Sequence, residues 1–454
     1  MSVPVRKSSL DRHKRETLLE LLHVKGKFNP LTEETPELLF LHTDDEFVYV
    51  PYYVSRVLYN NDNQYRRQTD ITFRSELRLH QVPIVREAID QLNEHGTTLI
   101  EAPPGAGKTV MGTFLASICK QKTIILVPIT TLGPQWMATI KQHTTSPAFM
   151  LHERKFSDKD ISLMVEAHFI VGYYERLTKV PKHIKDSCGL LILDESHLLA
   201  RQTAIEPILS VTPKYIVACS ATPSRKDGLY KAIQTVTGPH SVKSDERPSF
   251  MVVKVNTGVV PATRKVMRAG KMQNDFVFLE KNSYLDVDRN ELIIKLCRRL
   301  STRENRSFIM VKRVDHGELL HQTMKTLMMS VGRFMEKDKK IDDCDVLVGM
   351  NKKAGTGYDE AAYCSQQVVP RRFMFLVHTI NNHESLHQVC GRVFRHTSPV
   401  VFDFVDNNYT MQNHWRTTRR PYYLREKAHI VELDACDVDS FDVDLALSSF
   451  QGDA

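Results

Sequence analysis

The chain lacks the features that would place it in a membrane or in an oxidising compartment. No stretch approaches eighteen consecutive apolar residues, which argues against a membrane-spanning helix. The N-terminal residues contain no apolar core of a secretory signal, so we expect an intracellular protein with no membrane partner. The eight cysteines include no Cys-x-x-Cys pair. This argues against a zinc knuckle or a disulfide framework and favours buried free thiols.

The last part of the chain lacks positive charge altogether. From Glu432 onward there are seven acidic residues and no Lys or Arg. Because the whole chain carries a net charge of +7, the residues before Glu432 carry about +14. A basic body indicates a polyanionic partner, although charge alone speaks only of encounter and solubility. The acidic end is either a disordered, solvating tail or a segment that binds a protein partner or masks the basic body.

What the chain does contain is a repeated alternation of apolar strands and amphipathic helices. Its 454 residues are enough for two or three domains. Strand patterns separated by helical stretches or loops predict parallel sheets covered by helices, which is the α/β fold class. The expected strands are 97–100, 123–127, 169–171, 190–193 and 215–219 in a first block, and 308–311, 346–348, 373–377 and 400–404 in a second block.

The same patterns divide the chain into five expected segments. A short N-terminal accessory segment precedes two α/β lobes, and a less regular connection, in which we expect a short hairpin, separates the lobes. An acidic tail follows. The boundaries are 1–70 for the accessory segment, 71–235 for the first lobe, 236–285 for the connection, 286–420 for the second lobe and 421–454 for the tail.

The most informative motif is the octet Ala102–Thr109, which lies between a strand pattern and a helix pattern. Gly105 and Gly107 allow backbone N–H groups to wrap a polyphosphate at the positive end of the following helix. Lys108 can reach the β- and γ-phosphates, and the Thr109 hydroxyl can ligate Mg²⁺. We therefore expect ATP and Mg²⁺ in the first lobe. The expected nucleotide-binding residues of the loop are Pro104, Gly105, Ala106, Gly107, Lys108 and Thr109.

Polar residues follow two further strands of the first block. Asp194 and Glu195 come directly after the fourth strand. An acidic residue that ends an apolar strand beside a phosphate loop is the usual second Mg²⁺ anchor, so we assign that role to Asp194. Glu195 is placed to orient and deprotonate the attacking water. The next strand leads into Ser220 and Thr222, whose hydroxyls we expect to hydrogen-bond the acidic pair.

In the second block Arg392 and Arg395 lie three residues apart in a predicted helix, so both guanidinium groups share one face. Such a pair can stabilise charge on the γ-phosphate as arginine fingers, a role worth about 10³–10⁵ in rate. A surface basic helix is the alternative. The loop 353–359, with Gly357 and Asp359, follows a strand and is placed to touch both nucleotide and nucleic-acid phosphate.

Residues that would touch nucleic acid are hard to find in a sequence, because most such contacts go to phosphate through backbone N–H groups and hydroxyls. Two basic clusters, Arg371–Arg372 and Arg416–Arg420, serve either nucleic-acid binding or solubility. The candidate contact residues are Thr130, Thr131, Tyr173, Tyr174, Arg176, Lys312, Arg313, Lys352 and Lys353.

Taken in order, these motifs resemble the series found in superfamily 2 helicases. The motifs are Gln81, 102–109, 127–128, Gln135-Trp136, 194–197, 220–222, 355–359 and 388–395. The resemblance spans roughly residues 76–410, and the whole series is far less expected by chance than any single motif. The segments 77–81, 288–290 and 312–316 look closest to the XPB and type III restriction branch and to the helicases of large DNA viruses, including the poxvirus transcript-release helicase.

The resemblance implies two RecA-like lobes that share the nucleotide. By it, Gln81 contacts adenine and the two arginines act as fingers. The residues implied to couple the nucleotide site to the second lobe are His197, Ser220, Thr222 and Gln388. The chain departs from the family in three respects. Ser196 stands where Ala or Cys is commoner, and residues 329–345 are short for the elements expected there. We also recognise no Cys-rich or accessory domain, which leaves the substrate preference open.

We therefore expect a nucleic-acid-dependent ATPase that translocates on DNA or opens duplexes. The resemblance favours 3′→5′ polarity and a role of the kind found in viral transcription, replication or repair. RNA or a DNA–RNA hybrid stays open as a partner, because a protein tells RNA from DNA at a given site by the 2′-hydroxyl. Two alternatives are a double-strand DNA translocase that does not separate strands, and a nucleotide-gated binding module that docks a polymerase or capsid.

Overall fold

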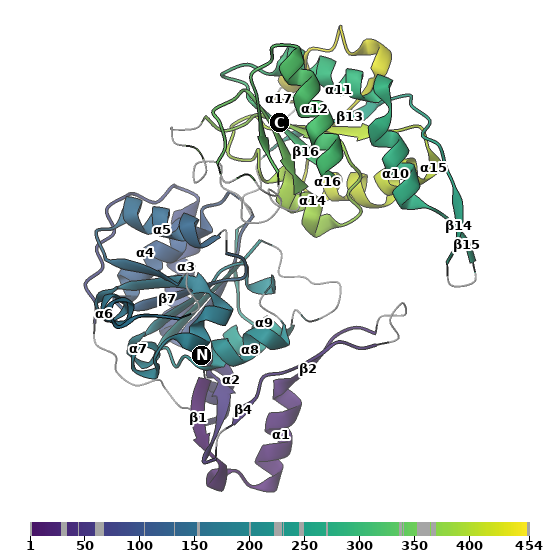
Figure 1. Ribbon diagram of the computed structural model, residues 1–454. Coiled ribbons are helices and arrows are strands. Elements are labelled where there is room, and N and C mark those ends of the chain that lie inside the picture. The colour runs from purple at the N-terminus through teal and green to yellow at the C-terminus, as the bar shows by residue number, and fades with distance from the viewer. Residues whose placement is uncertain are drawn as a thin grey trace. The chain divides into compact units, whose positions relative to one another are not determined.

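The computed structural model resolves the chain into two compact units, Met1–Glu246 and Arg247–Ala454, each with its own sheet and apolar cores (Figure 1). The structure describes residues 2–28, 34–43, 45–59, 68–103, 105–130, 132–151, 155–198, 201–221, 229, 231–244, 249–268, 271–335, 338, 340–351, 364 and 369–451. None of the helices in these ranges has the length and apolar character needed to cross a bilayer.

The N-terminal part of unit 1 is a small antiparallel sheet of order β1-β5-β4 with one long helix and a further pair of short strands. Asp11 begins α1, because its side chain accepts a hydrogen bond from the backbone N–H of Lys14. Leu22 and Val50 pack into the same core as the large sheet of the unit. The elements are β1 Ser2–Arg6, η1 Lys7–Ser9, α1 Arg12–Leu22, β2 His23–Lys25, β3 Glu37–Leu39, β4 His42–Thr43, β5 Phe47–Pro51 and α2 Tyr52–Tyr59.

A seven-stranded parallel sheet of order β12-β6-β11-β10-β7-β9-β8 forms the centre of unit 1. Its inner strands are continuous apolar runs because both faces of the sheet are covered. All five strands expected here are present, with β8 and β12 added at the edges. The strands are β6 Thr97–Glu101, β7 Thr123–Val127, β8 Ala148–Leu151, β9 Phe169–Tyr173, β10 Leu190–Leu193, β11 Tyr215–Ser220 and β12 Val242–Lys243.

Helices cover both faces of this sheet. Helices α3, α4 and α5 pack their apolar side chains on one face. Helices α6 to α9 and the N-terminal elements cover the other. Helix α3 ends at Gly96, whose φ of +72° closes the last turn in a conformation that glycine adopts without strain. The helices are α3 Gln81–His95, α4 Lys108–Cys119, α5 Leu132–His143, α6 Asp158–Glu166, η2 Tyr174–Lys179, α7 Lys182–Ser187, η3 Ser196–Leu198, α8 Gln202–Leu209 and α9 Lys231–Thr237.

Unit 2 contains a second seven-stranded parallel sheet, of order β17-β18-β16-β19-β20-β13-β21. The four strands expected from the sequence form its middle. A separate antiparallel ribbon, β14-β15, belongs to the same unit. The strands are β13 Met251–Asn256, β14 Lys265–Arg268, β15 Lys271–Asn274, β16 Ser307–Val311, β17 Val331–Phe334, β18 Val346–Met350, β19 Phe373–Leu376, β20 Val400–Val405 and β21 His429–Asp434.

The faces of the second sheet are also covered by helices. Helices α11, α12 and α17 pack on one face. Helices α14 and α16 and the π-helical turn between α15 and α16 pack on the other. The helices are α10 Phe276–Leu285, α11 Val287–Leu300, α12 Val314–Thr326, α14 His383–Cys390, α15 Tyr409–His414, the π-helical turn η5 Trp415–Arg419, α16 Arg420–Arg425, η6 Ala435–Asp437 and α17 Val443–Gln451.

The α/β fold class is confirmed, but two segments differ from their expected character. The expected connection, 236–285, supplies β13, which lies inside the second sheet, together with the expected hairpin and α10. The expected acidic tail is folded through residue 451, because β21 pairs with β13 and Leu433 is buried. A disordered end was therefore the wrong expectation for 429–451. The five segment boundaries stay a prediction.

Candidate active site

The expected ATP-site residues of unit 1 follow three neighbouring strands. In the sheet order β6-β11-β10, the phosphate loop follows β6, Ser220 ends β11 and Asp194 follows β10. The strands are parallel, so their carboxyl ends meet at one edge, where open α/β sheets bind ligands. The backbone N–H of Ala102 donates to the Ser220 carbonyl at 3.1 Å, which joins the start of the loop to the end of β11.

The phosphate loop has the backbone that its glycines predict. Gly105 and Gly107 have φ of +86° and +84°, a region that side chains rarely adopt. A β-carbon at Gly107 would also lie 2.2 Å from Nε2 of Gln81. Helix α4 begins at the next residue, Lys108, so its free N–H groups point toward the loop. Pro104 lies outside the described residues.

Lys108 is held inside the loop. Its side chain is buried, and Nζ donates to the carbonyl of Ala102 at 3.0 Å and to that of Pro103 at 3.4 Å. These carbonyls satisfy the ammonium group at the base of the loop. The adjacent Thr109 is half-buried in the first turn of α4, where its hydroxyl is near the N-terminal end of the helix.

Gln81 is buried and ties the start of α3 to the phosphate loop. Its Nε2 donates to the Ala106 carbonyl at 2.9 Å, and its Oε1 accepts from the Arg78 backbone N–H at 2.9 Å. His80 Nε2 also lies 3.3 Å from the Ala106 carbonyl. Gln81 therefore positions the loop itself, and the adenine contact implied by the resemblance stays a prediction.

Asp194 is a buried carboxyl group held in one orientation. Trp136 Nε1 donates to its Oδ2 at 2.7 Å, and the Glu195 backbone N–H donates to its Oδ1 at 2.9 Å. Burial, followed by the nearby charge of Glu195, raises the pKa of Asp194 to about 6. Trp136 itself is fully buried in α5, and a β-carbon at Gly112 of α4 would meet its ring at 2.8 Å.

Trp136 was not assigned a role at the site from the sequence. Its position in the motif series was visible, but an indole N–H directed at a carboxylate 58 residues away was not. The one available signal was chemical: a tryptophan in a helix pattern after the second strand needs a partner for its N–H when buried.

Glu195 has an unusual backbone and a histidine neighbour. Its φ is +42°, a left-handed conformation that costs a non-glycine residue energy and is concentrated at functional sites. Its Oε2 lies 3.5 Å from Nδ1 of buried His197, and the same Nδ1 lies 2.9 Å from Ser220 Oγ. The structure thus brings Glu195, His197 and Ser220 together. Thr222 lies outside the described residues.

The Mg²⁺ site expected at Thr109 and Asp194 stays a prediction. Among the described residues no cluster of three or more His, Cys, Asp or Glu side chains could hold a metal. Mg²⁺ at nucleotide sites usually takes one or two protein oxygens together with phosphate oxygens and water. An oriented Asp194 carboxylate and the Thr109 hydroxyl match that need.

The arginines expected as fingers do not lie on a helix. Helix α14 contains Gln388 and ends at Cys390. Arg392 and Arg395 follow in consecutive tight turns, in which the Arg392 backbone N–H donates to the Val389 carbonyl at 3.1 Å. The helix expected for them was therefore too long, because Gly391 begins a chain of turns. Their role as fingers stays a prediction. Gly357, Asp359 and the rest of the loop 353–359 lie outside the described residues.

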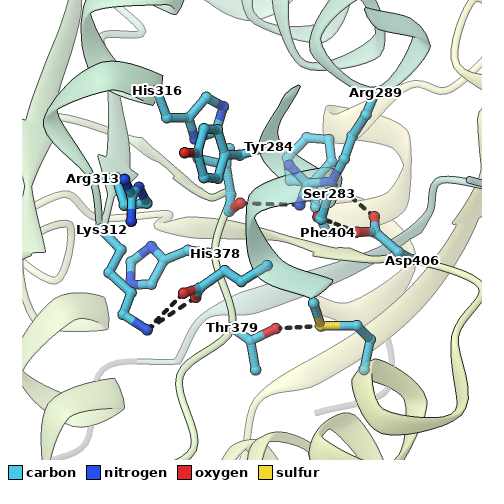
Figure 2. Close-up of a pocket in the computed structure, with 13 residues that line it drawn as sticks. Ser283, Tyr284, Arg289, Lys312, Arg313, His316, His378, Thr379, Phe404 and Asp406 are labelled. Carbon is cyan, nitrogen blue, oxygen red and sulfur yellow. Dashed lines mark hydrogen bonds and ion pairs between the residues drawn. The ribbon is translucent and has the colours of Figure 1, made fainter. Parts of the chain in front are cut away.

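Lys312 and Arg313 lie in a polar pocket of unit 2, at the carboxyl ends of β16, β19 and β20 (Figure 2). Lys312 Nζ is 2.8 Å from an oxygen of Glu280. Arg313 makes two hydrogen bonds of 3.1 Å to Asp315 and lies over the ring of Tyr284. Both cations are therefore placed at a ligand-binding edge, and each has an acidic partner. The Arg313 bonds lower the pKa of Asp315 to about 2.

A buried ion pair forms one wall of this pocket. Arg289 Nε donates to Asp406 Oδ1 at 2.8 Å, and its Nη2 donates to the Val377 carbonyl at 3.0 Å (Figure 2). Asp406 also accepts from Thr257 at 2.8 Å and from Ser283. This pair joins α11 to β19, β20 and α10. Arg289 was expected only as part of the family-like segment 288–290 and had no predicted role of its own.

The basic clusters and the remaining contact candidates divide by burial. Arg371 is buried and donates to the Ser307 carbonyl at 2.7 Å. Buried Arg419 pairs with buried Asp403. Both arginines thus hold the fold together, so neither solubility nor nucleic-acid contact was the right expectation for them. Buried Tyr174 was also a wrong surface candidate.

Three of the expected nucleic-acid residues of unit 1 are open to solvent. Thr130 is exposed, and Arg176 is partly exposed. Tyr173 is partly exposed, its hydroxyl lies 3.2 Å from that of Tyr174, and burial raises its pKa to about 12. These three stay candidates. Thr131, Lys352 and Lys353 lie outside the described residues.

Comparisons with known proteins agree with this arrangement. Residues 74–225 match the family model "Type III restriction enzyme, res subunit". The "Putative helicase 161L" of Invertebrate iridescent virus 6 is 27% identical over 382 residues, 77% of this chain and 81% of that protein. "DNA 3'-5' translocase XPB2" of Sulfurisphaera tokodaii is 29% identical over 154 residues, 34% of this chain and 33% of that protein. The fold resembles S. cerevisiae Dbp5 bound to RNA and ADP BeF3, with a TM-score of 0.52 and 13% identity over 80% of this chain and 95% of that one.

Proposed function

Because the chain belongs to the superfamily 2 helicases, with tandem RecA-like lobes and relatives in the type III restriction, XPB and viral branches, we propose that it couples ATP hydrolysis to movement along nucleic acid. One observation carries the proposal. The phosphate loop, Asp194 with Glu195, and His197 with Ser220 meet at the carboxyl ends of three adjacent parallel strands. DNA is the proposed track, moved along in the 3′→5′ direction that the name of the XPB2 relative carries.

Each residue of the loop has a proposed task in hydrolysis. Lys108 leaves the Ala102 and Pro103 carbonyls and binds the β- and γ-phosphates, while the backbone of Gly105, Ala106 and Gly107 holds the remaining phosphate oxygens. Thr109 and Asp194 would hold Mg²⁺, which would neutralise charge on the phosphates. Gln81 holds the loop against α3, and we assign Pro104 to nucleotide binding.

Glu195 orients the attacking water and takes its proton. Its carboxylate faces His197, and His197 contacts Ser220, so a change at Glu195 reaches the end of β11 through two contacts. We assign these residues, with Thr222 and Gln388, to coupling. We further propose that Arg392, Arg395, Gly357 and Asp359 act on the nucleotide.

The decisive experiment is steady-state ATP turnover with single-stranded DNA, double-stranded DNA and RNA as separate activators. We expect at least one of them to raise turnover, and a Lys108→Ala variant to lack turnover under all conditions. Turnover that ignores every nucleic acid would contradict the proposal and favour the nucleotide-gated binding module. An intracellular site of action and a role in viral transcription, replication or repair stay predictions.

A second function deserves its own test, because one relative is named as a translocase. A double-strand DNA translocase would displace the third strand of a triplex and leave a forked duplex intact. A helicase would separate the strands of the fork. Running both displacement assays on the same preparation tells the two apart.

A further inference from the structure

Between β13 and α10 the chain leaves the second sheet as a two-stranded antiparallel ribbon, which extends away from the rest of unit 2 (Figure 1). The register pairs Met267 of β14 with Met272 of β15. Their side chains are 65% and 59% exposed. Two-stranded ribbons are marginally stable in water, and exposed apolar pairs usually mark a contact surface.

The ribbon is also strongly basic. Residues 264–274 contain Arg264, Lys265, Arg268 and Lys271 and no Asp or Glu. Met267, Met272 and Lys265 lie on one face, because side chains alternate along a strand and directly paired residues share a face. A surface that combines cations with an apolar pair matches nucleic acid, which offers phosphates beside apolar base surfaces.

The base of the ribbon is clamped to α10. Arg264 Nη2 lies 2.5 Å from Asp275 Oδ2, and the Asp275 backbone N–H donates to the Arg264 carbonyl at 2.7 Å. The other Asp275 oxygen caps α10 by accepting from the Phe278 N–H. Arg264 also lies over the Phe278 ring. These contacts fix the direction in which the ribbon leaves the unit.

Helix α10 in turn connects the ribbon to the carboxyl edge of the second sheet. Glu280 pairs with Lys312 at 2.8 Å, and the Tyr284 hydroxyl donates to Asp315 at 2.8 Å (Figure 2). Ser283 donates to buried Asp406. Contacts along α10 therefore link the base of the ribbon to the residues that follow β16.

We propose that the β14–β15 ribbon binds a nucleic-acid duplex, with Met267 and Met272 against the bases and Lys265 against the phosphates. The major groove admits a two-stranded β-ribbon, and the thymine methyl groups that it exposes offer apolar contact to side chains such as Met267 and Met272. The inference rests on the proposed function and deepens it, because it assigns duplex contact to an element outside the ATP site.

The first test measures duplex binding by the full chain without nucleotide. The double variant Met267→Ala/Met272→Ala should bind a forked DNA duplex about tenfold more weakly, with single-strand binding changed less than about twofold. Lys265→Ala should reduce the salt slope of duplex binding by about 1. Met328→Ala is the matched control, because Met328 is 92% exposed and follows the end of α12, away from the carboxyl edge.

The second test uses methionine oxidation, which needs no variant. Bound duplex should protect Met267 and Met272 from peroxide, while Met328 stays as reactive as in the free protein. Unchanged oxidation of Met267 and Met272 with duplex present, or unchanged duplex binding by the double variant, overturns the proposal and leaves the ribbon as a surface for another protein. Failure of the proposed function is a separate result, namely wild-type ATP turnover that no nucleic acid alters.

Discussion

At the scale of single residues, the fold buries Asp194 and so shifts the pKa of a carboxyl group on which the proposed chemistry of the site depends. A carboxyl group in water has a pKa far below 7 and is therefore ionised at neutral pH. Burial, followed by the nearby charge of Glu195, raises the pKa of Asp194 to about 6. The Trp136 hydrogen bond opposes this rise because it stabilises the ionised form. The negative charge of Asp194, which would hold Mg²⁺, therefore depends in part on the hydrogen bond from the Trp136 indole N–H.

ATP turnover should fall as the pH drops through about 6, because protonated Asp194 is a poor Mg²⁺ ligand. Trp136→Phe keeps an aromatic ring against Gly112 but removes the donor. The variant should raise the pKa of Asp194 and move the acid limb of the pH–rate profile to higher pH. A profile that does not move would show that Trp136 contributes only packing.

Glu195→Gln should bind ATP and nucleic acid normally but turn over at least about 10²-fold more slowly, since the group that takes the proton from water is lost. Equilibrium nucleotide binding and steady-state turnover measure the two effects separately. Glu101→Gln is the control, because Glu101 is also a shielded carboxylate at a strand end, with 12% of its side chain exposed. Normal turnover by Glu195→Gln would remove Glu195 from its assigned role.

At the scale of elements, the sequence predicted nine of the fourteen strands in the two seven-stranded sheets that the structure describes, and two of the missed strands, β13 and β21, contain charged residues. Strand β13 lies inside the second sheet but contains Lys254, whose chain is buried while Nζ reaches Glu432 at 3.2 Å and the Trp415 ring. Strand β21 is an edge strand in which acidic residues alternate with an apolar residue near its C-terminal end. Both depend on partners more than 150 residues away, which no local pattern shows.

In the candidate site, too, some features leave a local signal in the sequence and others depend on contacts between distant elements. The loop 102–109 and the acidic pair were predictable, because strand ends and glycines leave local signals. The Gln81–Ala106 and Trp136–Asp194 contacts were not, because they join elements that are distant in the chain. The turns at Arg392 and Arg395 were missed because the helical period continues past Gly391 in the sequence.

The folded acidic end makes a prediction about stability. Leu433→Ala should lower the free energy of unfolding by about 2–5 kcal/mol, since Leu433 of β21 is only 3% exposed. Leu445→Ala in α17 should change it by less than about 0.5 kcal/mol, because Leu445 is 69% exposed. Chemical denaturation measures both. Equal stability of the Leu433 variant would favour a loosely attached segment that is free to dock a partner.

At the scale of the whole molecule, each unit has its own sheet with a ligand-binding edge. The edge of the sheet in unit 1 carries the phosphate loop and the acidic pair, Asp194 and Glu195. Unit 2 contributes Arg392 and Arg395 in turns beyond α14, together with the pocket around Arg289 and Lys312.

Arg395→Ala tests whether the units share the nucleotide. The variant should bind ATP nearly normally and hydrolyse it about 10³-fold more slowly, because an arginine finger acts on charge that develops during the reaction. Nucleotide binding and single-turnover hydrolysis separate the effects. Arg416→Ala serves as the control at an exposed position of the same unit. Weakened binding at an unchanged rate would contradict the finger assignment.

The resting position of Lys108 has a consequence for which anions can enter. Its ammonium group already donates hydrogen bonds to two backbone carbonyl oxygens. A ligand that takes their place must make up for the loss of these hydrogen bonds before its own contacts favour binding. A lone inorganic phosphate offers little beyond what it displaces, whereas a triphosphate adds contacts along the whole turn and the first N–H groups of α4. We therefore expect the loop to prefer a triphosphate to a lone inorganic phosphate.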